Sequence, residues 1–556
     1  MTLKQQIHRF LVLALALLVV TGCGIIETQT VPGLTPVANQ TSSPTPFQPL
    51  HNQLFLAGSV PQTWRNSLAK LSDIQISEGD AENALSISLD KPGDGEKEYG
   101  VFSRVYAAVV PFPTIEDEIS HDSLIALWQG IPGGEGVFTQ LIVSEESAAI
   151  FAEFWGGNPS GNVFVVRHDE ILDKAWLSSS AVAIIPFEEL TPKWKVLKIA
   201  GISPLDKPMD TASYPLILHY QLNGPITLDT QQSDLVERIV TELPATNRDE
   251  EKMTVVVMSG TTALTRTIAY KMDLKGTDYP TQDIKEWFLS ADLRHVSNEV
   301  SIFPDCPEPD PWTNSLKFCT KQKYLPVLES IGVNVVELTG NHLNDYGSKV
   351  FADTIEIYQD LGWDYFGGGL NLIEAQKPLE ISVNGNKIAF IGCNVAGPGS
   401  DFATEDAAGS APCDPEVYYS TITRLKNAGY IVIATFQHHE VYVYMYDSAL
   451  RKDFLDAAAA GADIVQGSQA HFPMGFEFSG EALIHYGLGN FLFDQMDTPV
   501  EGTRRQFIDR HIIYDGQYIN TEVLTALLTD WSRPVPMSSV QRKQFLEDIF
   551  QASQMR

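Results

Sequence analysis

A strand that ends in a run of polar residues constrains the fold of this chain more than any other stretch. Residues 333–336 form a short β-branched run typical of a buried strand, and residues 348–361 carry apolar side chains at helical spacing. The turn between them carries an amide, an imidazole and a carboxylate, at Asn341, His342 and Asp345. In open α/β sheets, ligands bind in the crevice beyond the carboxyl ends of the strands, so we expect these side chains to face a cleft.

The polar turn has a second interpretation, as the N-terminal cap of the helix that follows. Asn and Asp are preferred at that position, and Gly347 would ease the turn. A cap makes no use of an imidazole, however, so His342 favours a functional cluster.

The same order, a strand followed by polar residues, recurs along residues 252–556. Asn384-Gly385 predicts a hairpin between two strands, and Asp414 is placed to cap a helix over 415–428. One polar turn is easily explained, whereas several that converge are the main argument for a site. The strands that we expect are 254–258, 388–391, 430–436, 463–465 and 482–486, with a terminal amphipathic helix in 538–556.

Residues 51–245 form a first region in which expected strands alternate with helices, as in α/β domains. The words Leu127-Trp-Gln-Gly130, Ala183-Ile-Ile-Pro-Phe187 and Tyr214-Pro-Leu216 resemble those of the type 2 periplasmic solute-binding fold, which includes phosphate-binding proteins. The alternative is a module that has lost its ligand and docks a partner or the neighbouring domain. The polar run 244–251 marks the domain boundary. The serines eligible to bind an oxyanion are Ser59, Ser120 and Ser123.

The N-terminus has the order of an export signal. Lys4 and Arg9 give a basic start, and residues 10–20 are apolar. About eleven apolar residues are too few to span a bilayer, which needs roughly 20. We therefore expect residues 1–22 to be a signal peptide that is removed.

Cys23, directly after Thr21-Gly22, resembles the cysteine of a bacterial lipobox, which implies a lipid on its thiol. The alternative is an ordinary signal peptide with an incidental cysteine. Residues 23–50 are rich in Thr, Pro and Ser and have too little apolar surface to fold, so we expect a tether. It would place the protein on the outer face of the cytoplasmic membrane, or on the periplasmic side of an envelope membrane.

Length and charge limit the remaining possibilities. A chain of 556 residues is too long for one core and predicts two or three domains. The formal net charge of −32 argues against a nucleic-acid partner, because a phosphate backbone requires a basic surface.

Four further cysteines favour disulfides, since an even number of thiols outside the cytoplasm is more often paired than reactive. Proximity in sequence pairs Cys306 with Cys319 and Cys393 with Cys413. None has the spacing of a thiolate zinc site.

Three short sequence motifs in residues 252–556 resemble the signature motifs of the CapA family of capsule-synthesis proteins, which are linked to poly-γ-glutamate production. They are Thr339-Gly-Asn-His-Leu-Asn-Asp-Tyr-Gly347, Gly467-x-x-x-His471 and Tyr486-Gly-Leu-Gly-Asn-Phe-Leu-Phe-Asp-Gln495. The resemblance implies a metallophosphoesterase-like α/β/β/α sandwich for residues 252–556, with ligands of a divalent metal on the loops after the strands.

Residue roles follow from that resemblance. Asn341 would ligate metal, and His342 would stabilise or protonate a departing oxygen, with Asp345 at the position of the Asp that follows the Asn-His of the family. Further metal ligands would be His471, one of His438 and His439, and Glu299. Because His438 and His439 are adjacent, at most one should face the cleft, and His485 inside an apolar strand is expected to be a core residue.

The sequence also departs from the family pattern. Gly260-Thr261 stands where the family has Gly-Asp, and Gln469 replaces the first histidine of its His-x-His word. A two-ion centre needs a bridging carboxylate, and Glu299, Glu440 and Asp345 would compensate only in part. Three functions therefore stay open: a metal-dependent hydrolase or transferase of the phosphoesterase type, a non-catalytic part of a capsule machine that holds a polyanionic polymer, and an anion-binding sensor or scaffold.

Overall fold

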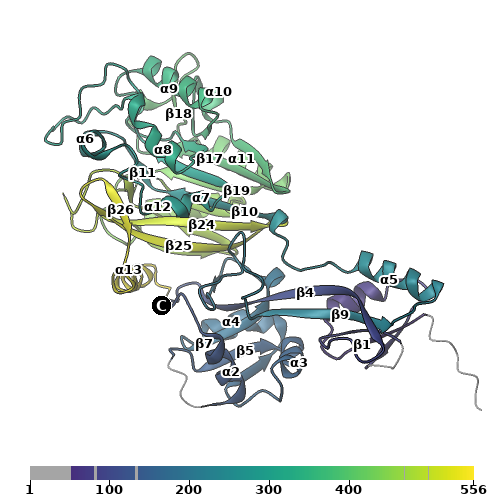
Figure 1. Ribbon diagram of the computed structural model, residues 1–556. Coiled ribbons are helices and arrows are strands. Elements are labelled where there is room, and N and C mark those ends of the chain that lie inside the picture. Colours follow the sequence, from purple (N-terminus) through teal and green to yellow (C-terminus); the bar gives the residue numbers. More distant parts are fainter. Residues whose placement is uncertain (1–51, 80–83, 132–135, 469, 499, 556) are drawn as a thin grey trace, which may run out of the picture. The chain divides into compact units, whose positions relative to one another are not determined.

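The computed structural model describes residues 52–79, 84–131, 136–468, 470–498 and 500–555 (Figure 1). The predicted signal peptide, Cys23 and the tether lie outside the described residues, as does Gln469. No helix in the described part of the chain is long and apolar enough to cross a membrane.

The first sheet is built from residues 53–225 and has the strand order β2-β1-β3-β9-β4-β7-β5-β6, with β8 beside β4. Strand β4 (Glu96–Pro111) pairs with β9 along most of its length and with β7 near its end, so it joins the two halves of the sheet. The other strands are β1 (Gln53–Leu56), β2 (Gln75–Glu78), β3 (Leu85–Ser88), β5 (Gln140–Ser144), β6 (Val163–Val166), β7 (Ala181–Pro186), β8 (Trp194–Val196) and β9 (Ile217–Pro225). The helices are α1 (Gln62–Leu68), α2 (His121–Gln129), α3 (Glu145–Phe154), α4 (Ile171–Trp176) and α5 (Thr230–Glu242).

A second sheet has the order β14-β13-β12-β10-β24-β25-β26, with β11 beside β12 and β23 beside β11. Its first strands run parallel, whereas β24 to β26 form an antiparallel meander. The strands are β10 (Met253–Ser259), β11 (Thr261–Thr262), β12 (Leu293–Asn298), β13 (Val335–Glu337), β14 (Asp364–Phe366), β23 (Asn490–Leu492), β24 (Arg505–Tyr514), β25 (Gln517–Thr529) and β26 (Arg533–Pro536).

A third sheet has the order β16-β17-β19-β20-β22-β21. The predicted Asn384-Gly385 hairpin is confirmed, and both residues have positive φ, of 50° and 77°, as a two-residue hairpin turn requires. The strands are β16 (Leu379–Val383), β17 (Asn386–Asn394), β19 (Ile431–Gln437), β20 (Ile464–Gly467), β21 (Phe476–Ser479) and β22 (Ala482–His485), and the short pair β15 (Gly368–Gly369) and β18 (Gly409–Ser410) lies apart from it.

The second and third sheets pack face to face, with an apolar layer between them that includes Val256, Val335, Phe390 and Ile433. Helices α6 (Arg266–Lys275), α7 (Lys285–Leu289), α8 (Pro326–Ser330) and α9 (Ser348–Asp360) cover the outer face of the second sheet. Helices α11 (Pro415–Asn427) and α12 (Ser448–Ala460) cover the third sheet, and the short α10 (Leu372–Ala375) packs beside them. The predicted α/β/β/α sandwich is confirmed. The domain boundary at 244–251 stays a prediction.

Local predictions agree with these elements. Asp414 caps α11 by accepting hydrogen bonds from the N–H groups of Glu416 and Val417. The disulfides Cys306–Cys319 and Cys393–Cys413 are both formed, as proximity in sequence predicted.

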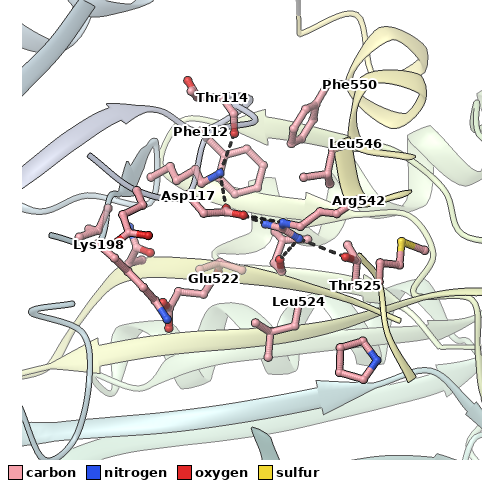
Figure 2. A pocket seen from close by; sticks show the side chains of 18 of the residues that line it. Phe112, Thr114, Asp117, Lys198, Glu522, Leu524, Thr525, Arg542, Leu546 and Phe550 are labelled. Carbon is pink, nitrogen blue, oxygen red and sulfur yellow. Dashed lines mark hydrogen bonds and ion pairs between the residues drawn. The ribbon is translucent and has the colours of Figure 1, made fainter. Parts of the chain in front are cut away.

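The terminal helix α13 (Ser539–Ala552) closes the edge of the sandwich with its apolar face, including Phe545 and Ile549. The guanidinium of Arg542 on this helix donates two hydrogen bonds to the carboxylate of Asp117, with N–O distances of 2.8 and 3.0 Å (Figure 2). Lys195 also contacts Asp117, at 2.7 Å, in the wall of the same cavity of about 240 Å³. All three charges are thus used in holding α13 against the chain that precedes the sandwich.

Two buried carboxylates connect the second sheet to the third. Glu337 on β13 accepts hydrogen bonds at 2.7 Å from Thr435 on β19 and from Thr339. Asp509 on β24 lies 2.6 Å from Nδ1 of His485 on β22 and accepts from Gln466 on β20 at 2.8 Å. His485 is fully buried, so its prediction as a core residue is confirmed.

We expect Asp509→Ala to lower the free energy of unfolding by about 3 to 5 kcal/mol, because it leaves His485 and Gln466 without their buried acceptor. Urea unfolding of the purified chain measures this. The matched control is Asp234→Ala on α5, which removes an exposed ion pair and should change stability by less than about 1 kcal/mol. Equal effects of the two substitutions would contradict a special role for the buried carboxylate.

Candidate functional site

The turn after β13 does not cap the helix that follows. The N-cap of α9 is Gly347, with φ of 96°, and no side chain accepts a hydrogen bond there. The capping interpretation of Asn341 and Asp345 is therefore excluded, and their side chains make other contacts.

A close approach of backbones sets this turn beside the end of β12. A Cβ atom on Gly340 would lie 2.7 Å from Cα of Glu299, so only glycine fits there. Next to it, Val300 and His342 form a parallel bridge. Glu299, from one strand end, and His342, from the next, thus belong to one cluster.

His342 and Asp345 form a hydrogen-bonded pair, with Nδ1 to Oδ2 at 2.9 Å. The N–H of Phe318 also donates to Asp345, at 2.6 Å, and the Phe318 ring packs edge-on against His342 with centroids 4.5 Å apart. Burial disfavours the charged imidazole, but the Asp345 hydrogen bond and the charges of Glu299, Asp345 and Asp401 outweigh it, so the pKa of His342 is raised.

His471 is fixed by Asn490 and faces two carboxylates. The Asn490 amide N–H₂ donates to the backbone oxygens of His471 and Thr503, each at 3.0 Å, so its Oδ1 must accept from Nδ1 of His471, at 2.8 Å. Nε2 of His471 then lies 3.9 Å from Glu299 and 3.8 Å from Glu440. His471 and Glu299 are buried, whereas Glu440 is exposed.

Polar side chains from the third sheet complete the cluster. Gln437, the last residue of β19, donates to Oδ1 of Asn341 at 3.2 Å. Tyr442 donates to Glu440 at 2.7 Å and accepts from Gln495 at 3.4 Å. Residues from the ends of β12, β13, β19 and β20 thus meet in one place.

His438 and His439 do not join this cluster. Nε2 of His438 lies 3.1 Å from Asp453, and its Nδ1 lies 2.7 Å from Nδ1 of His439. Nε2 of His439 in turn lies 2.6 Å from Asp447. Both rings therefore turn toward α12, because Asp447 and Asp453 lie at its N-terminal end and first turns. The structure does not bring His438, predicted as a metal ligand, to His471.

The residues do not fit the two-ion centre that the resemblance implies. Thr261 stands at the position of the missing aspartate, and its hydroxyl donates to the backbone oxygen of Ser468 at 3.2 Å. Across the described ranges, no group of three or more His, Cys, Asp and Glu side chains is arranged to hold a metal ion. Of the predicted ligands, only Glu299, Glu440 and His471 converge, with Asn341 on the adjacent turn.

The serines that were eligible to bind an oxyanion have structural partners. Ser59 donates to Glu153 at 2.8 Å, and Ser120 caps α2 by accepting from the N–H of Ser123. Ser120 and Ser123 also line a cavity of about 470 Å³. Binding of an anion by this region stays a prediction.

Sequence reasoning gave no role to Asn490, Tyr442 and Asp401. Asn490 lies within the motif Tyr486–Gln495 that resembles the family, so its position in that motif could have indicated a role in the site. Tyr442 and Asp401 had no such signal, because they come from loops whose path depends on the tertiary fold.

The fold and the cluster define the class of this region: an α/β/β/α sandwich with ionisable and amide side chains gathered beyond the ends of its parallel strands. Residues 255–495 match the family model described as bacterial capsule synthesis protein PGA_cap. This part of the chain is therefore similar to that capsule-synthesis family.

Two curated relatives match the same region. The capsule biosynthesis protein CapA of Bacillus anthracis is 28% identical over 275 residues, which are 47% of this chain and 64% of that protein. The PGA biosynthesis protein CapA of Bacillus subtilis is 30% identical over 227 residues, which are 40% of this chain and 58% of that protein. The match thus spans about three fifths of the length of each relative.

Solved structures show only distant similarity. A phosphate transport receptor from Vibrio cholerae has a TM-score of 0.27 and 10% identity, over 34% of this chain and 94% of that one. The NAD nucleotidase of Haemophilus influenzae has a TM-score of 0.30 and 9% identity, over 55% of this chain and 59% of that one. Similarity at this level says nothing about ligand or reaction.

A buried carboxylate next to the His342 turn should make stability depend on pH. Asp401 is 2% exposed, and its Oδ1 accepts from the N–H of Asn344 at 3.2 Å. Burial raises its pKa from 3.8 to about 7, although the Asn344 hydrogen bond and His342 act in the opposite direction.

Between about pH 4 and pH 7 the folded chain keeps a proton on Asp401 that the unfolded chain has lost, so stability falls as pH rises through this window. Asp401→Asn removes the titration and keeps an oxygen for Asn344. We therefore expect the free energy of unfolding of this variant, relative to that of the unsubstituted chain, to increase by up to about 4 kcal/mol as the pH rises from 4 to 7. Urea unfolding at several pH values measures the gain. A difference that does not change with pH would show that the Asp401 pKa is ordinary.

Proposed function

We propose that residues 255–495 act in the synthesis or export of an extracellular, polyanionic capsule polymer. We further propose that the side chains gathered beyond the strand ends, the strand-end cluster of Glu299, Asn341, His342, Asp345, Glu440 and His471, carry out hydrolysis or transfer on that polymer. One observation carries the proposal: the His342–Asp345 pair lies beside a buried Glu299, which also faces His471. The match of residues 255–495 to the capsule-synthesis family model and the similarity to the two CapA proteins support the polymer as substrate.

In this proposal His342 is the general acid. Asp345 accepts the Nδ1 proton and its charge stabilises the imidazolium, so Nε2 is left to donate a proton to the departing oxygen or nitrogen. The Phe318 ring and the hydrogen bond from its N–H hold the pair in this orientation. As the bond to the leaving group breaks, the imidazole becomes neutral.

Glu440 is our candidate for the base. Its carboxylate is exposed and hydrogen-bonded to Tyr442, so it can receive the proton of an attacking water or hydroxyl group. The hydrogen bond from the neighbouring His471 to Asn490 keeps Nε2 of the histidine directed toward both Glu299 and Glu440.

A second function, holding the polymer without chemistry, is favoured by a specific observation. Thr261, which stands in place of the aspartate of the family, binds the backbone oxygen of Ser468, and His438, a predicted metal ligand, binds Asp453 instead. A chain that no longer assembles the implied metal centre could retain the binding surface alone.

We further propose that the protein is exported and held by a lipid on Cys23, with the envelope membrane and the capsule machinery as its partners. The order of a basic start, an apolar run and the cysteine supports this. In this setting the region from 51 to 245 serves as an anion binder, a sensor module or a spacer.

We expect His342→Ala to reduce the surface polymer of cells that depend on this chain by about a hundredfold or more, the usual contribution of a general acid. The measurement is polymer per cell at equal protein level. The matched control is His439→Ala, since His439 is exposed and bonded to Asp447 outside the cluster, and it should stay within about twofold.

An unchanged amount of polymer per cell in the His342→Ala strain would contradict the role of His342 as general acid. The function of holding the polymer without chemistry would then stay. Elemental analysis of the purified chain, with and without His471→Ala, separately tests for a divalent cation. Two equivalents of metal per chain, lost on the substitution, would contradict the assessment that these side chains do not form a two-ion centre.

We expect Cys23→Ser to move the protein from the membrane fraction to the soluble extracellular or periplasmic fraction, because the thiol that would carry the lipid is gone. Cell fractionation followed by immunoblotting measures the shift. Retention of the variant in the membrane fraction would contradict the lipid anchor, and Cys306→Ser serves as the control for a cysteine in a disulfide.

A further inference from the structure

The side chain of Arg266 packs against two aromatic rings, one of which contacts His342 and the other His471. It is the first residue of α6, with φ of 44°, and its Nη2 forms an ion pair with Asp494. The guanidinium packs over the rings of Phe318 and Phe493, at 4.7 and 5.1 Å from their centroids. Phe318 contacts His342, and the centroid of Phe493 lies 4.4 Å from that of His471, so one ring separates Arg266 from each histidine.

The hydrogen-bonding capacity of this arginine is only partly used. Its Nε atom is buried and has no hydrogen-bond partner among the described residues, while its side chain is 20% exposed. A buried charged donor without a partner is energetically costly, so such groups in native proteins usually meet water or a ligand.

A cavity of about 290 Å³ opens beside Arg266 and receives two further cations. They are Lys317 and Lys321, which come from or border the loop that Cys306–Cys319 closes. Lys321 pairs with Glu308, whereas Lys317 is exposed and forms no ion pair within the described part of the chain. Three cations and two carboxylates, Glu308 and Asp310, thus line the cavity; because Arg266 pairs with Asp494 and Lys321 with Glu308, Lys317 is the lining cation left without an ion pair in the described chain.

Lys317 thus gives this cavity a cation for an incoming anion, in a chain whose net charge of −32 repels anions over most of its surface. The volume lies near the lower limit for small-molecule sites, so it suits one anionic group and not a whole polymer unit. A planar guanidinium with a fixed fork is the side chain best matched to a carboxylate or a phosphate group.

We propose that this cavity is an anion subsite, in which Arg266 and Lys317 bind a carboxylate or phosphate group carried on an extended chain whose neighbouring unit lies at His342. The inference rests on the proposed function for its substrate, but binding at the subsite does not require the His342 acid. Arg266 and Lys317 would set the register of the chain by holding one charged group a fixed distance from the reacting bond.

Fluorescence anisotropy of a labelled oligoglutamate with the full chain tests the subsite directly. We expect Lys317→Gln to weaken binding about tenfold, through the loss of a charge-assisted contact, and Arg266→Lys to weaken it by at least as much, because the fork is lost. The matched control is Lys349→Gln on α9, which is highly exposed and pairs with Asp353 outside the cavity, and it should leave binding unchanged.

Competition with inorganic phosphate identifies the group that the subsite accepts: displacement of the oligoglutamate supports a phosphate-accepting subsite, and no displacement supports a carboxylate-selective one. His342→Ala should retain binding, so loss of polymer synthesis with retained binding separates the two proposals. No binding of the oligoglutamate together with no binding of phosphate, or equal weakening by Lys317→Gln and Lys349→Gln, would overturn the subsite. Thermal unfolding of Arg266→Lys and Lys317→Gln checks that a weakened variant is folded.

Discussion

The arrangement of the whole sandwich depends on hydrogen bonds that cross between its two sheets inside an apolar layer. Glu337 and Asp509 belong to one sheet, and their partners Thr435, His485 and Gln466 belong to the other. Apolar packing alone tolerates sliding of one sheet over the other, since it is not directional. A buried carboxylate is costly unless its acceptor positions are filled, so each of these bonds allows only one relative position of the sheets.

The site is a consequence of that position. Glu337 ends β13, and the bonds that it forms with Thr339 and Thr435 bring the His342 turn next to the end of β19, from which Gln437 reaches Asn341. Cross-sheet bonds thus align the carboxyl ends of parallel strands from both sheets at one edge. Side chains about 130 residues apart in sequence meet there, although no single strand carries more than a few of them.

Much of the fold could be predicted from sequence because its signals are local. The Asn384-Gly385 turn, the Asp414 cap and the apolar face of α13 each depend on a few neighbouring residues, and all three agree with the structure. The contribution of His438 could not be predicted, because its direction is set by Asp453, fifteen positions later on another element. Arg266 was equally hidden, since its meaning depends on Phe318 and Phe493, which only the tertiary fold brings to it.

The departures from the family pattern also make physical sense within this structure. An aspartate at position 261 would place a charge in a fully buried segment, where it would need a cation to balance it. Threonine there is neutral, and its hydroxyl binds the backbone oxygen of Ser468 and so ties β11 to the end of β20. The same change removes one negative charge from the vicinity of Glu299. A proton on His342, whose pKa is raised despite its burial by the Asp345 hydrogen bond and the nearby carboxylates, then balances more of the remaining charge.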